Sequence, residues 1–168
     1  LGGCTAPAGT ANIQVIPSPG PPQLSSNSPI CEGEELSLIA IHDSTGAYSW
    51  TGPGGFFFSG PQVNGYFPSS TTQSGFYLSI FHQNACSSEP DSIFVQILES
   101  PEVPQILPAG PYCEGEVIRI TVSVPDPLVT YNWSGPLGFN DTGQEIYLSP
   151  AGTGLVGTYS VVATIGEC

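Results

Sequence analysis

The chain of 168 residues contains five cysteines at regular spacing. Cys4, Cys86 and Cys168 stand 82 residues apart, and the same interval separates Cys31 from Cys113. Cysteines repeated in a small, loop-rich chain without lysine predict disulfides formed in an oxidising compartment outside the cytoplasm. We therefore expect an extracellular or cell-surface protein whose covalent chemistry is disulfide formation.

Carboxylates are the second group of residues that could form a functional site. The chain has 14 Asp and Glu against one basic residue, Arg119, and a formal net charge of −13. This charge excludes nucleic acid as a partner and direct insertion into a membrane, and it favours divalent cations. A calcium site is one interpretation of the acids near the expected repeat boundary, and solvated surface charge is the simpler one; these residues are Glu32, Glu34, Glu99, Glu102, Asp126 and Glu167. No other cofactor is expected.

The sequence around the cysteines also repeats. Three motifs recur in order, namely PICEGE at 29–34 as PYCEGE at 111–116, YSWTGP at 48–53 as YNWSGP at 131–136, and GFY at 75–77 as GTY at 157–159. A fixed period of this length is typical of domain arrays.

Turn residues divide the chain into short apolar runs with period two. With 21 glycines and 18 prolines between such runs, the sequence predicts an all-β fold of tandem immunoglobulin-like β-sandwiches. Expected strands cover residues 23–28, 35–42, 47–51, 56–59, 63–67, 75–82 and 92–98.

The same pattern predicts three segments. Residues 1–17 hold the last strand of a preceding repeat, at 11–16; residues 18–99 form a complete repeat; residues 100–168 form a second repeat that lacks its final strand. Two interpretations stay open. The sequence is an excerpt from a longer array, or identical chains exchange strands, so that residues 11–16 of one complete the open edge of the next.

The motifs at 30–36, 48–56, 74–77 and 85–88 resemble the immunoglobulin-like and PKD-like repeats of very large surface proteins of the Bacteroidota. The resemblance covers nearly the whole chain. It implies gliding or attachment adhesins, often exported by the type IX secretion system, in which such repeats serve as stalks, spacers or adhesive modules. It brings no catalytic residues, and we do not expect an enzyme.

Strand direction bears on the disulfides. Cys31 precedes the strand at 35–42 and Cys86 follows the strand at 75–82; these strands run in roughly the same direction, which separates the two cysteines by about 26 Å. Bridged Cα atoms lie within about 7 Å of each other. We therefore favour an interdomain bridge from Cys31 to Cys168 over a Cys31–Cys86 bridge. Cys4, Cys86 and Cys113 would then pair beyond this sequence or between chains.

Three consecutive aromatic residues, Phe56, Phe57 and Phe58, cannot all face one side of a strand. At least one should be exposed or should contact a glycan, a surface ligand or another protein. Trp50 and Trp133 fit the sandwich core better than a carbohydrate platform.

Four positions match short glycosylation patterns. Asn132 and Asn140 begin N-glycan sequons, and Ser44 and Ser92 resemble the O-glycan acceptors of Bacteroidota exported proteins. The function that the sequence favours is a structural or adhesive repeat acting as a stiff stalk or filament, with neighbouring repeats or identical chains as partners. A glycan- or protein-binding module and an accessory domain of a secreted enzyme are the alternatives.

Overall fold

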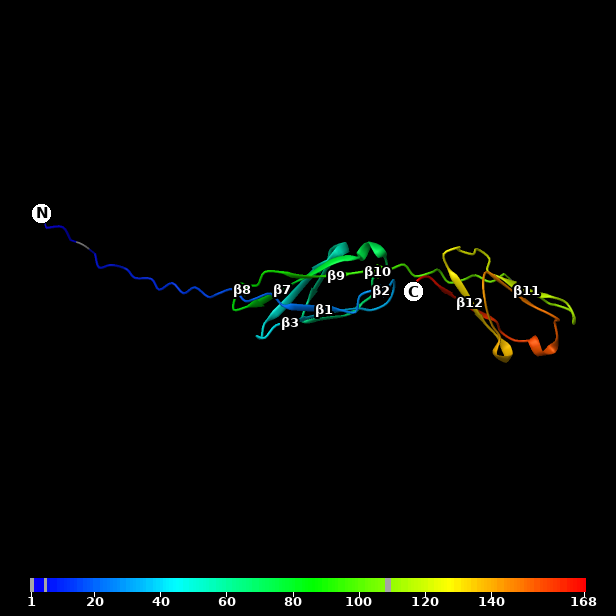
Figure 1. Cartoon of the computed structure of the whole chain (residues 1–168). Helices are drawn as coiled ribbons and strands as arrows, with labels where there is room; N and C mark the ends of the chain where they lie inside the picture. The colour runs from blue at the N-terminus through cyan, green and yellow to red at the C-terminus, as the bar shows by residue number, and fades with distance from the viewer. Residues whose placement is uncertain (1, 5, 108–109) are drawn as a thin grey trace.

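The computed structural model describes residues 2–4, 6–107 and 110–168, and its strands form two groups that lie end to end (Figure 1). We call these groups unit 1 and unit 2. Unit 1 comprises β1 (Gln23–Ser26), β2 (Ile30–Cys31), β3 (Leu36–Ile41), β4 (Ala47–Gly52), β5 (Phe56–Ser59), β6 (Gln62–Tyr66), β7 (Gly75–Gln83), β8 (Cys86–Ser87), β9 (Asp91–Val95) and β10 (Ile97–Leu98). Unit 2 comprises β11 (Ile118–Thr121), β12 (Thr130–Ser134), β13 (Asn140–Thr142), β14 (Glu145–Leu148) and β15 (Ser160–Thr164).

Unit 1 has the strand order of an immunoglobulin-like sandwich. One sheet runs β1-β3-β6, and the other runs β5-β4-β7, with β8 and β9 both pairing with β7. These ladders are antiparallel, whereas β10 pairs with β2 in parallel. A short 3-10 turn, η1 (Pro53–Gly55), connects β4 to β5 within one sheet, and another, η2 (Thr71–Gln73), connects β6 of one sheet to β7 of the other.

Unit 2 repeats this plan with fewer strands. Its sheets are β11-β14 and β13-β12-β15, with 3-10 turns η3 (Pro136–Gly138) and η4 (Thr153–Leu155). An isolated bridge between Ile106 and Val122 stands where β1 pairs with β3 in unit 1. Within the described part of the chain, β15 pairs only with β12, so its other edge is open.

Each unit has its own hydrophobic core. In unit 1 alternate residues of β3 and β7 point inward around Trp50, which is fully buried. In unit 2 Trp133 occupies the same place. The chain is therefore an all-β, immunoglobulin-like β-sandwich protein, as the alternation of the strands predicts.

The same contacts hold the aromatic residues of both cores. The indole nitrogen of Trp50 donates to the carbonyl of Gly60 at 3.0 Å, and that of Trp133 donates to Gly143 at 2.8 Å. The hydroxyl of Tyr77 donates to Gln73 O, four residues upstream, and Tyr159 does the same to Leu155 O, both at 3.1 Å. Such a tyrosine anchors the turn that enters its strand.

A glycine makes room for each of these tyrosine rings. A Cβ atom on Gly52 would lie 2.6 Å from the ring of Tyr77, and one on Gly135 would lie 2.5 Å from the ring of Tyr159. The glycine of each Trp-x-Gly-Pro motif is thus required by close packing rather than by chain flexibility.

Most predicted strands are present with ends shifted by one or two residues; the last of them is divided into β9 and β10. The exception is the segment 11–16, which forms no strand and lies extended and exposed. An isolated β segment lacks a ladder partner for its backbone amides, and none of the described residues supplies one. Whether this segment belongs to a preceding repeat stays a prediction.

Candidate functional site at the junction

A disulfide joins the two units. Cys31 in β2 is bonded to Cys168, which lies just after β15, across a sequence separation of 137 residues. Their Cα atoms are 5.7 Å apart, within the usual range for a disulfide. This is the pair that strand direction favours. Figure 1 shows the reason, because β8, which contains Cys86, and β2 lie at opposite ends of unit 1.

The Cys-Glu-Gly-Glu motif is a turn that presents the cysteine. The carboxylate of Glu34 accepts a hydrogen bond from Cys31 N at 2.9 Å, and Glu34 N donates to Cys31 O at 3.0 Å. Gly33 has a φ of 82°, a conformation that favours glycine. In unit 2 the carboxylate of Glu116 accepts from Cys113 N at 2.7 Å in the same way.

The linker between the units is hydrogen-bonded to this turn. Glu32 N donates to Leu98 O at 2.9 Å, and the hydroxyl of Ser100 donates to Glu32 O at 3.0 Å. The carboxylate of Glu32 accepts from Thr71 N at 2.7 Å. The disulfide and the hydrogen bonds that hold the start of the linker therefore lie together at the turn that begins at Cys31.

The acidic residues at the junction are not gathered around one point. Among residues 2–4, 6–107 and 110–168, no group of three or more His, Cys, Asp or Glu side chains is placed to hold a metal ion. Glu32 and Glu34 bind backbone amides, whereas Glu99, Glu102 and Asp126 line a separate cavity of about 630 Å³ between the linker and unit 2. We propose no calcium site from this arrangement.

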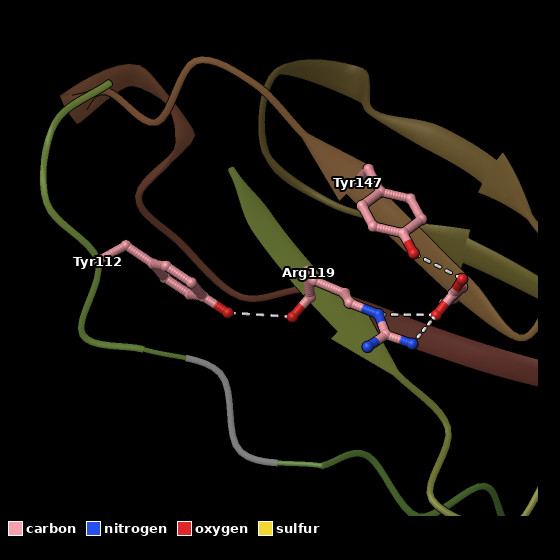
Figure 2. A network of polar contacts seen from close by, with 4 residues as sticks. Tyr112, Arg119 and Tyr147 are labelled. Atoms are coloured by element: carbon pink, nitrogen blue, oxygen red, sulfur yellow. Dashed lines mark hydrogen bonds and ion pairs between the residues drawn. The ribbon is translucent and has the colours of Figure 1, made fainter. Parts of the chain in front are cut away.

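A polar network that the sequence argument missed covers the outer face of unit 2 (Figure 2). Arg119 Nε donates to the Glu145 carboxylate at 2.8 Å, a second guanidinium nitrogen forms an ion pair with the same oxygen, and the Tyr147 hydroxyl donates to the other oxygen at 2.7 Å. Tyr112 donates to Arg119 O at 3.0 Å. The Tyr147 and Arg119 hydrogen bonds lower the pKa of the Glu145 carboxyl, and the Glu145 hydrogen bond raises the pKa of both partners.

The two histidines occupy separate environments. His42 stacks on Phe81 with ring centroids 4.0 Å apart. His82 lies between two hydroxyls, Ser49 Oγ at 2.8 Å from Nε2 and Ser87 Oγ at 2.9 Å from Nδ1. A serine-histidine contact is half of a hydrolase triad, but here a second hydroxyl takes the place of the orienting carboxylate.

Of the three consecutive phenylalanines, Phe57 is exposed and the other two face inward. This confirms the expectation that at least one is exposed. Phe56 packs against Tyr66 and Tyr77. Phe76 and Phe94 are also exposed, and their rings meet edge to face across β7 and β9 with centroids 5.3 Å apart. Sequence reasoning missed this pair because the two residues are far apart in the chain.

The four candidate glycosylation residues are exposed. Ser44 lies in a turn, Ser92 in β9, Asn132 in β12 and Asn140 at the start of β13. The side-chain amide of Asn140 donates to Gly138 O at 2.8 Å. Modification at these positions stays a prediction.

Within the described ranges, no helix is long and apolar enough to span a lipid bilayer.

No family model and no curated protein matches the chain. Solved structures similar to it include a mouse coronavirus receptor-binding domain complexed with its murine receptor, at 10% identity and a TM-score of 0.46, covering 87% of this chain and 93% of that one. The human OSCAR ligand-binding domain has 14% identity and a TM-score of 0.40, covering 90% and 93%. A two-domain fibronectin type III segment of chicken tenascin has 14% identity and a TM-score of 0.38, covering 87% and 92%. At these scores the assignment of the fold rests on the strand order itself.

Proposed function

We propose that the chain is a structural or adhesive segment of an extracellular surface protein and acts as a stiff stalk. The observation that carries this proposal is the Cys31–Cys168 disulfide. It gives the two units a second covalent connection, in addition to the linker that follows Leu98. Two sandwiches joined by a linker alone are expected to move relative to each other, unless a large interface holds them.

Contacts of the linker support the same proposal. The linker contains Pro101 and Pro104, and Ser100 is hydrogen-bonded to the turn that carries Cys31. Proline limits the backbone conformations of a linker, and the disulfide limits rotation about it. The combination favours one fixed angle between the units over a flexible hinge.

An exported, surface location fits the chemistry. Structural disulfides persist in oxidising compartments, and the charge of −13 keeps an extended surface protein soluble. The resemblance to repeats of Bacteroidota surface proteins implies the same location.

The test is small-angle X-ray scattering of the oxidised chain and of Cys31→Ser. We expect the variant to show a broader distribution of interatomic distances, because its units are joined only by the linker. Cys113→Ser is the matched control, since that exposed cysteine forms no disulfide in the structure. Equal distributions for the oxidised chain and Cys31→Ser would contradict the stalk proposal.

A binding role is favoured by a separate observation. Phe57, Phe76 and Phe94 are exposed on the outer face of the β5-β4-β7-β9 sheet, where ladder pairing and alternation place them together. Aromatic faces of this kind bind glycans or proteins. Binding to a glycan array that is lost in Phe57→Ala and kept in Leu137→Ala, an exposed residue of unit 2, would support this role. No binding, or no change, counts against it.

A further inference from the structure

The outer face of the β5-β4-β7-β9 sheet carries hydroxyl groups beside its aromatic rings. Residues that pair across an antiparallel ladder point to the same side of the sheet. Thr51 pairs with both Phe57 and Leu78, so these three residues lie on the side opposite the buried Trp50. The same alternation places five hydroxyl residues on this face, namely Ser49, Thr51, Ser59, Ser87 and Ser92.

This face has no formally charged side chain. The only acid in the strands β4, β5, β7, β8 and β9 is Asp91, and these strands contain no Lys or Arg. Asp91 pairs with Ser79, which points into the core, so alternation turns the carboxylate away from the outer face. The chain as a whole has a net charge of −13, which repels anionic ligands. A ligand of this face is therefore expected to be neutral.

His82 connects two of the hydroxyls. Its Nε2 lies 2.8 Å from Ser49 Oγ, and its Nδ1 lies 2.9 Å from Ser87 Oγ. A neutral imidazole has one N–H donor and one acceptor nitrogen, so the ring donates to one serine and accepts from the other. The serine that accepts keeps its own O–H free to donate, and the other serine keeps lone pairs free to accept. Neither hydroxyl has another side-chain or backbone partner in the described part of the chain.

The tautomer of His82 determines which serine can donate to a ligand. A change of tautomer, with rotation of both hydroxyls, exchanges the roles of Ser49 and Ser87. The hydroxyl group of a saccharide is itself both a donor and an acceptor, so it can be matched in either arrangement. This adaptable pair therefore suits a ligand whose polar groups are hydroxyls better than a carboxylate, which only accepts, or an ammonium group, which only donates.

Phe57 lies close enough to Ser49 for one sugar ring to contact both. Ser49 pairs with Ser59, and Phe57 stands two residues before Ser59 in β5, which makes Phe57 a diagonal neighbour of Ser49. Such neighbours are about 7–8 Å apart, within reach of an aromatic side chain. The Phe57 side chain is 68% exposed. The negative face of an aromatic ring attracts the C–H groups of a sugar, which carry a partial positive charge.

The composition of this face differs from that of a protein interface. The centre of a protein–protein interface is enriched in Tyr, Trp, Met and Arg and depleted of Ser and Ala. None of the first four residue types points outward from these strands, and the nearest neighbours of Phe57 on the face include Ser59 and Thr51. A ring surrounded by hydroxyls favours a saccharide over a protein as the occupant.

We propose that the outer face of the β5-β4-β7-β9 sheet binds a neutral saccharide, with a sugar ring stacked on Phe57 and a sugar hydroxyl bonded to Ser49. His82 and Ser87 are positioning residues, because they set whether Ser49 donates or accepts. This inference deepens the binding role proposed for Phe57 and rests on it. The stalk proposal does not depend on it.

The first test titrates the oxidised full chain with soluble oligosaccharides of glucose, mannose and galactose, followed by NMR. Oligogalacturonic acid of matched length is the anionic counterpart of the galactose series. We expect at least one neutral oligosaccharide to bind with an affinity that does not change with salt concentration, because no ion pair is formed. Oligogalacturonic acid should not bind.

The two histidines provide a local measurement of the site. Nitrogen NMR signals of an imidazole report its tautomer. We expect the bound oligosaccharide to change the signals of His82, which is hydrogen-bonded to Ser49, and to leave those of His42 unchanged. His42 stacks on Phe81, whose side chain is buried in unit 1, and so it is a matched control within the same molecule.

Three variants separate the contributions of the ring and the hydroxyl. Phe57→Ala should weaken binding by about tenfold, because the stacked ring is lost. Ser49→Ala should weaken it by about three- to tenfold, because one hydrogen bond is lost. Ser25→Ala, the matched control, removes an exposed hydroxyl from β1 in the opposite sheet and should change binding by less than about twofold. The indole signal of Trp50 verifies that unit 1 is folded in each variant.

The outcomes distinguish this proposal from the binding role on which it rests. Binding that is weakened in Phe57→Ala but unchanged in Ser49→Ala, with unmoved His82 signals, would overturn the saccharide site and leave the role of Phe57 in place. Binding of oligogalacturonic acid alone would have the same meaning. If no oligosaccharide binds, the proposal is overturned. Signals of Phe57 that shift with protein concentration alone would identify a protein interface and overturn it as well.

Discussion

Removing the junction disulfide should destabilise unit 2 by an amount set by the length of chain that the bond closes. When unit 2 unfolds while unit 1 stays folded, Leu98 and Cys31 are still held side by side in the β10–β2 ladder. The loop then runs from Glu99 to Cys168, about 70 residues. Closing a loop of this length lowers the entropy of the unfolded chain and stabilises the folded unit by about 4 kcal/mol.

The perturbation is Cys168→Ser, and the assay follows each unit separately during chemical denaturation. Trp50 and Trp133 provide one indole NMR signal per unit, and each indole is hydrogen-bonded in its own core. We expect the Trp133 signal of the variant to be lost at a lower denaturant concentration, by the equivalent of about 4 kcal/mol. Cys31→Ser should have the same effect, and the double variant no larger one, because either change opens the same loop.

Cys113→Ser is the control, since it removes an exposed thiol of unit 2 that forms no disulfide in the structure. If Cys168→Ser and the oxidised chain lose the Trp133 signal at the same denaturant concentration, the loop-closure argument is refuted. A loss in the double variant that equals the sum of the single losses would show instead that the two serines act locally.

Three further predictions concern single side chains. Ser79 is fully buried, its hydroxyl has no hydrogen-bond partner in the described part of the chain, and Val161 takes its place in unit 2; Ser79→Ala should therefore raise the free energy of unfolding of unit 1 by about 1 kcal/mol, measured by denaturation. Gly135→Ala should lower that of unit 2 by about 1–3 kcal/mol, because the new methyl meets the Tyr159 ring; an unchanged midpoint would mean that the ring moves aside freely. The pKa of the Glu145 carboxyl is lower in the folded chain, so the carboxylate stabilises unit 2 at pH above its ordinary pKa, and this contribution is lost as the pH falls through the folded pKa. Glu145→Gln should thus be less stable than the unmodified chain at neutral pH, with the two denaturation midpoints converging in acid, and a difference that persists in acid would argue against the ion pair with Arg119.

Much of the fold was predictable because each strand carries its own pattern. Alternation and turn residues predicted strands at 35–42 and 75–82, which the structure has as β3 and β7, and the direction of these strands separates Cys31 from Cys86. Strand direction is a property of the fold class and does not depend on where individual side chains lie. It therefore favours the pairing of Cys31 with Cys168, which the structure contains.

Contacts between residues on different strands were harder to anticipate. Arg119 and Glu145 meet because β11 pairs with β14 in a particular register, which alternation alone does not determine. The charge of the acids suggests a cation site, whereas the carboxylate of Glu34 accepts a hydrogen bond from the backbone amide of Cys31, three residues away. The signal for a local turn is the repetition of Cys-Glu-Gly-Glu in both units. Its second glutamate stands three residues after the cysteine each time, and in both units it accepts a hydrogen bond from the cysteine amide.

The junction disulfide also determines the path through the chain of a force applied at Cys168. A tension applied at Cys168 passes through the disulfide to Cys31 and so enters unit 1 directly, without crossing the strands of unit 2. The segment between Leu98 and Cys168, about 240 Å of chain when extended, stays out of the force path as long as the bond is intact. Reduction would release this hidden length, so the redox state of one bond sets how far the chain can stretch.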